Sequence, residues 1–274
     1  AERTAVIAPL RGILRFVASA LIVVAGAVST VLLAWVPIKV RGVRLSAWCF
    51  SLGVRMLMPS LGLRFECTDC ERIIQHRGFI LSNHVSFFDT LVMAWLLPMR
   101  FVAKAEVKHW PFIGWIARAT GSLFVDRSDK SDRNSVRRQV ADAVLANQYP
   151  PIVIFPEGTR NPLDTLLPFR YGVFDIAIDT EMPYLLCAIH YEETDSMTWH
   201  SRNEGVLTTV KRIVMRDTSR VWLVPLEVIE PHHGDDSTEL ASQAREIIGV
   251  ALSKIRATND PASALQAEGS EQLR

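Results

Sequence analysis

Residues 151–160 read Pro-Ile-Val-Ile-Phe-Pro-Glu-Gly-Thr-Arg, and their pattern indicates both the class of fold and the place of its chemistry. Its first five residues form an apolar run without alternation, which is typical of a strand buried on both faces of a sheet. Pro156 and Gly158 then turn the chain sharply. Loops at the ends of buried strands carry polar side chains out of the sheet. The stretch therefore predicts an α/β domain whose chemistry lies where its strands end.

Short apolar runs and helix-like stretches alternate on both sides of this segment. They predict further strands at residues 79–81, 101–103, 122–125, 184–189, 208–215 and 221–228, an apolar stretch at 87–97, and helices at 132–148 and 237–255. The predicted fold class is α/β, with a single domain over residues 64–256 in which a mixed sheet is flanked by helices. Residues 257–274 are small and polar and are predicted to form a flexible tail.

Composition excludes several classes of protein. Of the 274 residues, 49% are hydrophobic and 22% are charged, so the chain can bury a sizeable core and is neither disordered nor a disulfide-rich miniprotein. Lys and Arg number 30 against 29 Asp and Glu, giving a net charge of +1. Such a balance provides no whole-molecule field for nucleic acid, so we expect no nucleic-acid partner.

The N-terminal 63 residues differ in character from the rest of the chain. No charged residue occurs between Phe16 and Val36, a run of about the ~20 residues that a helix needs to cross a bilayer core. A second apolar stretch, residues 45–63, carries Arg55 in its middle and is expected at the membrane interface or against the first helix. Basic residues flank the first stretch on both sides, so a helical hairpin in one leaflet and a full span both fit. Residues 1–63 are predicted to be membrane-associated helices, with a buried core helix as the alternative.

The four cysteines, Cys49, Cys67, Cys70 and Cys187, contain one C-x-x-C pair. No second pair completes a zinc site, and the histidines lack ligand spacing, so we predict no metal. The cysteines are interpreted as thiols in a reducing compartment.

Residues 83–89, Asn-His-Val-Ser-Phe-Phe-Asp, follow the strand predicted at 79–81. If His84 lies in the loop and Asp89 in the first turn of the next helix, the carboxylate can accept a hydrogen bond from one imidazole nitrogen. The other nitrogen is then free to act as a general base. The sequence fixes no Ser or Cys nucleophile beside this pair, so the attacking group would be a hydroxyl of the substrate. Taken alone, the H-x-x-x-x-D spacing is common by chance.

The ends of two more predicted strands also carry charged side chains. Arg160 offers a planar fork suited to a phosphate, Glu157 could orient that arginine or a substrate hydroxyl, and Thr159 adds a neutral donor. Residues 121–127, Gly-Ser-Leu-Phe-Val-Asp-Arg, end in an adjacent acid and base. Surface ion pairs at turns are the alternative interpretation of both loops.

The three segments, in this order and spacing, resemble the signatures of the glycerolipid acyltransferase family, which contains 1-acylglycerol-3-phosphate and lysophospholipid acyltransferases. Residues 168–174 and Lys104 also match positions of that family, and the resemblance covers residues 78–228. Residues 182–189 depart from it, because they keep one proline where many members have two.

The resemblance implies transfer of a fatty acyl chain from acyl-CoA or acyl-carrier protein to a hydroxyl of a phosphorylated glycerol acceptor. His84 and Asp89 would be catalytic, with His84 taking the hydroxyl proton and no acyl-enzyme formed. The substrate-binding residues would be Glu157, Gly158, Thr159, Arg160, Lys104 and Arg127, the basic ones holding the phosphate. No cofactor or metal is implied.

Lysophosphatidic acid is the expected acceptor, and a lysolipid with a larger head group or lyso-ornithine lipid is the alternative. A non-catalytic lipid-binding protein is disfavoured because His84 and Asp89 are both present, and a serine hydrolase because no G-x-S-x-G elbow occurs. Lipid substrates predict contact with membrane lipids. Cytoplasmic donors predict a catalytic domain that faces the cytoplasm, on the inner membrane of a bacterium or on the endoplasmic reticulum.

Overall fold

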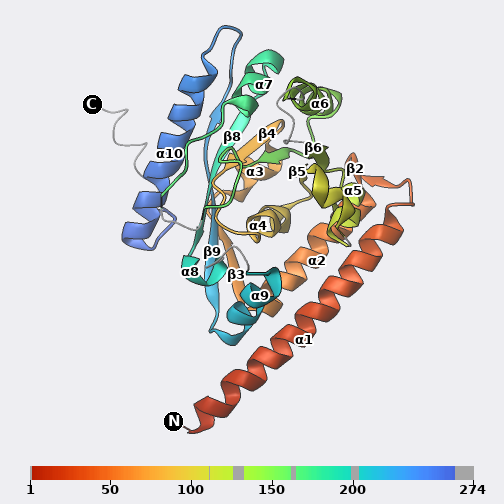
Figure 1. The fold of residues 1–274 in the computed structure, drawn as a ribbon, viewed down its shortest axis with the longest axis vertical. Helices are drawn as coiled ribbons and strands as arrows, with labels where there is room; N and C mark the ends of the chain where they lie inside the picture. The colour runs from red at the N-terminus through yellow and green to blue at the C-terminus, as the bar shows by residue number, and fades with distance from the viewer. Residues whose placement is uncertain (1, 111, 126–132, 162–164, 199–203, 263–274) are drawn as a thin grey trace.

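The computed structural model describes residues 2–110, 112–125, 133–161, 165–198 and 204–262 (Figure 1). Its centre is a seven-stranded sheet with the order β3-β9-β8-β4-β7-β5-β6. The strands are β3 (Leu63–Cys67), β4 (Phe79–Ser82), β5 (Arg100–Lys104), β6 (Leu123–Val125), β7 (Ile152–Ile154), β8 (Tyr184–Tyr191) and β9 (Ser219–Ile229). A separate two-stranded ribbon consists of β1 (Lys39–Val40) and β2 (Val43–Arg44).

The sheet is mixed, as the sequence predicts. Strands β8, β4, β7, β5 and β6 run parallel to one another, whereas β9 is antiparallel to β8 and carries β3 parallel to itself. In the register, Phe79 of β4 pairs with Ile152 of β7 and with Tyr184 of β8. The carboxyl ends of β4, β7, β5 and β6 therefore open on one edge of the sheet.

Helices cover both faces of the sheet, and Figure 1 shows α10 and α1 on opposite sides of it. One face carries α6 (Arg133–Ala146), α7 (Gly172–Thr180) and α10 (Ser237–Thr258); the other carries α2 (Leu45–Leu61), α3 (Cys70–Gln75), α4 (Asp89–Leu96) and α9 (Val206–Met215). Phe79 and Leu81 point to the first layer and Ile80 to the second, and none of the three is exposed. This burial on both faces explains the continuous apolar runs in the sequence.

The N-terminal hairpin consists of α1 (Glu2–Leu33), the β1–β2 ribbon and α2. Small residues allow the two helices to lie close together: a Cβ placed on Gly26 would be 3.9 Å from the Cα of Gly53. The hydroxyls of Ser19 and Ser60 are 2.8 Å apart. The second apolar stretch thus packs against the first helix, as expected. Its Arg55 donates hydrogen bonds to carbonyls at the end of α4, so the guanidinium has polar partners within an apolar sequence.

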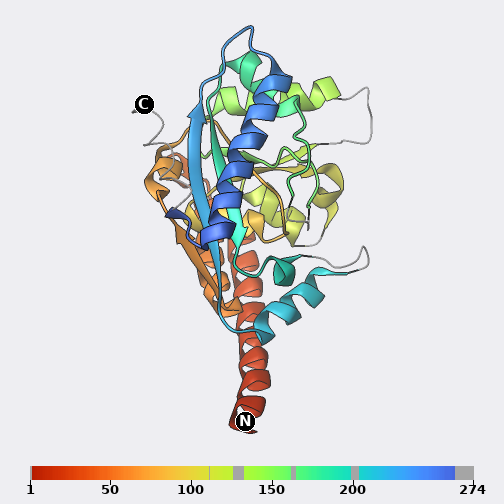
Figure 2. The same cartoon turned by 90° about the vertical axis from the view of Figure 1, so that its left-hand side faces the viewer.

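Large apolar side chains lie on the outside of α1. Residues 9–33 are long and apolar enough to cross a membrane, and only 17% of the most apolar window is buried in the protein. The exposed side chains recur every three or four residues at Leu10, Leu14, Val17, Leu21, Val24, Val28 and Leu32. The buried residues of α1 are small instead, namely Gly12, Ser19, Ala27 and Thr30. Figure 2 shows the N-terminal end of α1 projecting beyond the rest of the molecule.

Some elements differ from the predictions. Residues 208–215 were expected to form a strand, because they are rich in β-branched residues, but they belong to helix α9. There Thr209, Ile213 and Val214 are buried on one face at helical spacing. Other elements were not predicted from the sequence: β1, β2, β3, α3, α7 and the short helices η1 (Ala105–His109), α5 (Ile113–Ala119) and α8 (Thr194–Met197).

Two further comparisons concern the cysteines and the C-terminus. The structure pairs Cys67 with Cys70 as a disulfide, so the interpretation of these two residues as thiols is wrong, whereas Cys49 and Cys187 are free. Helix α10 continues to Thr258, and residues 263–274 of the predicted tail lie outside the described residues.

The first testable prediction concerns Arg100, at the start of β5. The residue is 9% exposed, and its guanidinium donates to the carbonyls of Ala143, Asn147 and Pro150, so it joins the end of α6 to the sheet. Burial lowers the pKa of Arg100 to about 10, which leaves the group charged at neutral pH. Arg100→Met leaves these carbonyls without their donor and should lower the free energy of unfolding by about 2–4 kcal/mol. Denaturant unfolding measures the loss, and Arg138→Ala on the exposed side of α6 is the control. Equal stability of the two variants would contradict this role.

Candidate active site

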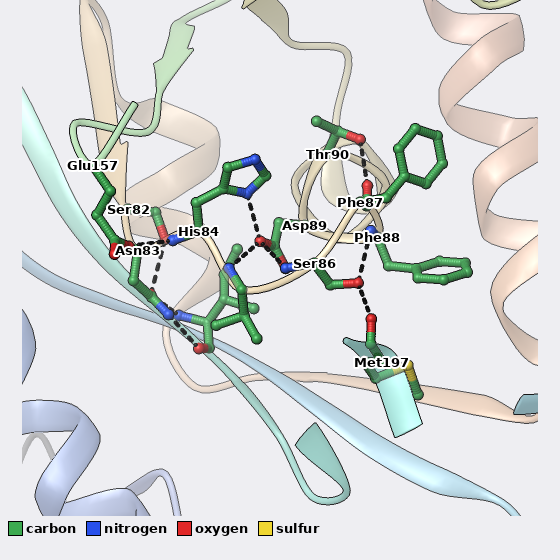
Figure 3. Close-up of polar contacts among 12 residues, drawn as sticks. Ser82, Asn83, His84, Ser86, Phe87, Phe88, Asp89, Thr90, Glu157 and Met197 are labelled. Carbon is green, nitrogen blue, oxygen red and sulfur yellow. Dashed lines mark hydrogen bonds and ion pairs between the residues drawn. The ribbon is translucent and has the colours of Figure 1, made fainter. Parts of the chain in front are cut away.

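His84 and Asp89 lie together at the carboxyl end of β4 (Figure 3). Strand β4 ends at Ser82, His84 lies in the following loop, and Asp89 is the first residue of α4. His84 Nδ1 is 2.8 Å from Asp89 Oδ2. The chain therefore adopts the loop-and-first-turn arrangement in which the two side chains can meet. Asp89 is unexposed, whereas the His84 side chain is 18% exposed. The pair is therefore buried at the carboxylate and accessible to solvent at the imidazole.

The Asp89 carboxylate accepts three further hydrogen bonds. Oδ2 accepts from the backbone N–H groups of Val85 and Ser86 at 2.7 and 2.8 Å, and Oδ1 accepts from the Tyr191 hydroxyl at 2.7 Å. Burial, and then the negative charge of Asp89, raise the pKa of Tyr191 well above its usual value, so the phenol remains a donor. Donors of this kind stabilise the ionised form of a buried carboxylate. A carboxylate held in this way accepts from the imidazole with a fixed direction.

The second imidazole nitrogen, Nε2, is directed away from Asp89 in Figure 3. Within the described part of the chain no hydrogen-bond partner occupies it. The ring stacks on Phe155 with 4.2 Å between centroids and 12° between planes. Stacking and the Asp89 contact together fix the ring, so that Nε2 can receive a proton from a group outside the protein.

Asn83 attaches the loop to the neighbouring strand. Its amide donates to the Ile189 carbonyl at 2.9 Å and accepts from the Ile189 N–H at 2.8 Å. The side chain thus continues the pairing of β4 with β8 beyond the point where the β4 backbone turns away. Its role in this structure is to set the position of His84.

Glu157 attaches the same loop to the turn after β7. One oxygen accepts from the His84 N–H at 2.8 Å and the other from the Leu167 N–H at 3.0 Å. The residue is 3% exposed. Burial raises the pKa of the Glu157 carboxyl, and the two backbone donors oppose that shift. Both oxygens therefore serve backbone groups, whereas the sequence assigned Glu157 to Arg160 or to the substrate.

The rest of the turn, residues 158–160, follows Glu157 in the chain. Gly158 has φ +71°, a conformation that favours glycine, and a Cβ there would be 2.6 Å from the Arg170 side chain, which would have to move. Thr159 is exposed, and Arg160 is partly buried. Burial lowers the pKa of Arg160 while the negative charge of Asp89 opposes that shift, which places the guanidinium within the field of the His84–Asp89 pair.

The remaining predicted binding residues follow the outer strands. Lys104 ends β5 and is exposed at the same edge of the sheet. Asp126 and Arg127, expected after β6, lie outside the described residues. The structure thus brings His84, Asp89 and the 157–160 turn together, and it places Lys104 on the same edge.

A segment between β8 and β9 also contacts the site. Ser86 Oγ donates to the Met197 carbonyl in α8 at 2.6 Å. Arg212 of α9 donates to the carbonyls of Asp195 and Thr198, which flank that contact. No local sequence pattern predicts these contacts or the role of Tyr191, the last residue of β8, because they depend on how distant segments fold against β4.

The geometry defines a chemical class. The site offers a general base oriented by a carboxylate, and within the described residues no Ser or Cys hydrogen-bonds to His84 as a nucleophile. Such a site removes a proton from a hydroxyl that the substrate brings, and a cation lies beside it. These are the requirements of group transfer to a hydroxyl acceptor.

Comparisons with known proteins identify the group transferred. The family model described as "Acyltransferase" matches residues 64–190. A 1-acyl-sn-glycerol-3-phosphate acyltransferase from Neisseria gonorrhoeae is 32% identical over 172 residues, 62% of this chain and 67% of that protein. A lyso-ornithine lipid O-acyltransferase from Pseudomonas aeruginosa is 30% identical over 175 residues, 63% of this chain and 66% of that protein. The matches span about two thirds of the length of these relatives.

A solved structure has the same fold. The crystal structure of PlsC, the 1-acyl-sn-glycerophosphate acyltransferase from Thermotoga maritima, gives a TM-score of 0.65 at 17% identity, covering 92% of this chain and 98% of that one. The site, the family match and the named relatives together define an acyltransferase. The chain belongs to the acyltransferase family, as its sequence motifs predict.

The second testable prediction concerns Tyr191 as a positioning residue. Tyr191→Phe removes the donor to Asp89 Oδ1, so the carboxylate accepts more strongly from the imidazole and favours its protonated form. We expect kcat about tenfold lower and the acidic limb of the pH–rate profile moved to higher pH. Tyr184→Phe, an equally buried change in β8 without contact to Asp89, is the control. An unmoved profile in Tyr191→Phe would leave this hydroxyl only a packing role.

Proposed function

We propose that the protein transfers a fatty acyl group from acyl-CoA or acyl-carrier protein to the free sn-2 hydroxyl of lysophosphatidic acid, making phosphatidic acid. The observation that carries the proposal is the 2.8 Å contact between His84 Nδ1 and Asp89 Oδ2, with Nε2 left open. Names of the relatives support it, because they include acyltransferases of 1-acyl-sn-glycerol-3-phosphate.

The proposed reaction uses the residues as follows. Nε2 of His84 takes the acceptor's hydroxyl proton while the hydroxyl oxygen attacks the thioester carbonyl carbon. The new C–O bond forms, the C–S bond breaks, and the departing thiolate receives the proton from the imidazolium. Asp89 stabilises the imidazolium between these steps. The step as written calls for no metal or redox cofactor.

Arg160 is proposed to hold the acceptor's phosphate, together with Lys104 and Arg127. A guanidinium binds a phosphate through two parallel hydrogen bonds, and partial burial strengthens them. A second candidate acceptor is lyso-ornithine lipid, because relatives of that name match the chain over a similar length. Its head group offers a carboxylate to the same guanidinium. Labelled acyl-CoA tested against lysophosphatidic acid and lyso-ornithine lipid decides between the two acceptors.

Membrane association is proposed to occur through the outer face of α1. The arrangement of large apolar residues outside and small ones inside is the reverse of that in a soluble surface helix. Helix α1 also packs on the domain near both ends: Arg11 pairs with Asp217 at 2.6 Å, and Val31 and Trp115 line one groove. This favours insertion into one leaflet over a full span. Because the proposed donors are cytoplasmic, the catalytic domain faces the cytoplasm, at the inner membrane if the source is bacterial.

The third testable prediction separates the base from its surroundings. His84→Ala should lower the transfer rate by about 10²–10⁴-fold and Asp89→Asn by less, because removal of the base costs more than its misorientation. The far-ultraviolet circular dichroism spectrum and vesicle binding should not change. His109→Ala, which changes an exposed histidine in η1, should keep full activity. Activity of His84→Ala within a few-fold of wild type would end the proposal.

The fourth prediction separates phosphate binding from chemistry. Arg160→Ala should raise KM for lysophosphatidic acid by about ten- to hundred-fold, the equivalent of a charge-assisted hydrogen bond, with a smaller effect on kcat. Arg160→Lys should recover part of this, because an ammonium lacks the fork. Steady-state kinetics with each substrate varied in turn measure both. A raised KM for acyl-CoA with an unchanged KM for the lysolipid would assign Arg160 to the donor.

A further inference from the structure

A groove of about 520 Å³ lies between the end of α1, the start of α2 and helix α5, away from His84. Its walls are apolar except for two arginines, and its lining residues are Val31, Ala34, Trp35, Arg44, Trp115, Arg118 and Ala119. A buried hydrogen bond at 2.7 Å from Ser46 Oγ to the Ala119 carbonyl fixes the two sides of the groove relative to each other. The hollow is therefore part of the fold.

Arg44 and Arg118 are both exposed, and among the residues that the structure describes neither guanidinium has a hydrogen-bond or ion-pair partner. Most arginines around α1 differ in this respect: Arg11, Arg15 and Arg55 each bind a carboxylate or a carbonyl. Two exposed guanidinium groups without a protein partner, beside an apolar wall, suit an anion that carries apolar groups. A phospholipid has that chemistry.

The location favours a lipid within a bilayer. The groove lies at the end of the exposed apolar stripe of α1, and Trp35 in its wall is 87% exposed. Trp110, Phe112 and Trp115 are about half exposed on the adjoining segment. Exposed tryptophans and arginines at the edge of an apolar surface are typical of the level where lipid head groups lie.

We propose that this groove binds an anionic phospholipid of the membrane, with the phosphate between Arg44 and Arg118 and the glycerol and upper acyl chains along Trp35 and Trp115. The inference rests on the membrane association proposed above. It adds a lipid site that is separate from the reacting lysolipid. The bound lipid would hold the end of the hairpin at the depth of the head groups.

The test measures binding of the full chain to vesicles of phosphatidylcholine alone and of phosphatidylcholine with phosphatidylglycerol, at 0.5 M salt. That salt concentration screens diffuse attraction between exposed charges beyond a few ångströms. Wild type should prefer the anionic vesicles by about tenfold or more, as expected for charge-assisted hydrogen bonds. Arg44→Ala/Arg118→Ala should reduce the preference to within about twofold, and Arg44→Lys/Arg118→Lys should restore part of it.

The matched control is Lys39→Ala/Arg41→Ala, which also removes two positive charges, from the β1–β2 ribbon that carries Arg44 but outside the groove. It should keep the preference, and an equal loss in both double variants would overturn the inference in favour of diffuse attraction. Activity on detergent-dispersed lysophosphatidic acid should be unchanged in Arg44→Ala/Arg118→Ala, which separates this test from the proposed reaction. Wild type that binds neither vesicle would overturn both the membrane association and the lipid site.

An acidic carrier protein is the competing occupant. If Arg44→Ala/Arg118→Ala keeps the anionic preference but loses activity with acyl-carrier protein and not with acyl-CoA, the groove receives the donor protein and the lipid inference is wrong.

Discussion

The buried carboxylate of Asp89 constrains the rest of the site. A charge with no exposure to water is costly unless donors surround it. Here two backbone N–H groups, a phenol and an imidazole supply those donors. For the amides of Val85 and Ser86 to reach the carboxylate, the loop must turn back immediately before α4. For the Tyr191 hydroxyl to reach it, β8 must lie beside β4. The start of α4 adds the favourable end of the helix dipole. One charge thus fixes a loop, a helix and two strands relative to one another.

The order of the strands extends this constraint to the second motif. Because β7 lies next to β4, the turn after β7 begins beside His84, and Glu157 bridges the two loops through backbone groups. The Asn161 N–H also donates to the His84 carbonyl at 2.8 Å. The motif residues therefore fall into two groups. Asn83, Glu157 and Gly158 shape and hold the loops, whereas His84 directs Nε2 away from Asp89.

The sequence predicted the parts of the fold in which a single local signal dominates. Continuous apolar runs identified β4, β7, β8 and β9, whereas the contact of His84 with Asp89 was expected only if the helix began at Asp89 and left His84 in the loop, as it does. Helix α9 was mistaken for a strand because its β-branched residues carry a strand preference that burial of one helical face overrides. The role of Glu157 in holding backbone groups depends on which loops meet in space, and the contribution of Tyr191 depends on a pairing across 102 residues of sequence. Neither leaves a local pattern.

The apolar helix and the site are connected through the segment between β8 and β9. Arg11 and Arg15 of α1 bind Asp217 and the Arg216 carbonyl beside α9. Arg212 of α9 holds the carbonyls of α8, and the Met197 carbonyl there accepts from Ser86, next to Asp89. Each link is a polar contact between packed elements, so the distance from the outer face of α1 to His84 is fixed by the fold. If that face lies in a leaflet, the depth of its insertion determines how far His84 lies from the acyl-chain region. A lysolipid then has to leave the bilayer only by that distance for its hydroxyl to reach His84.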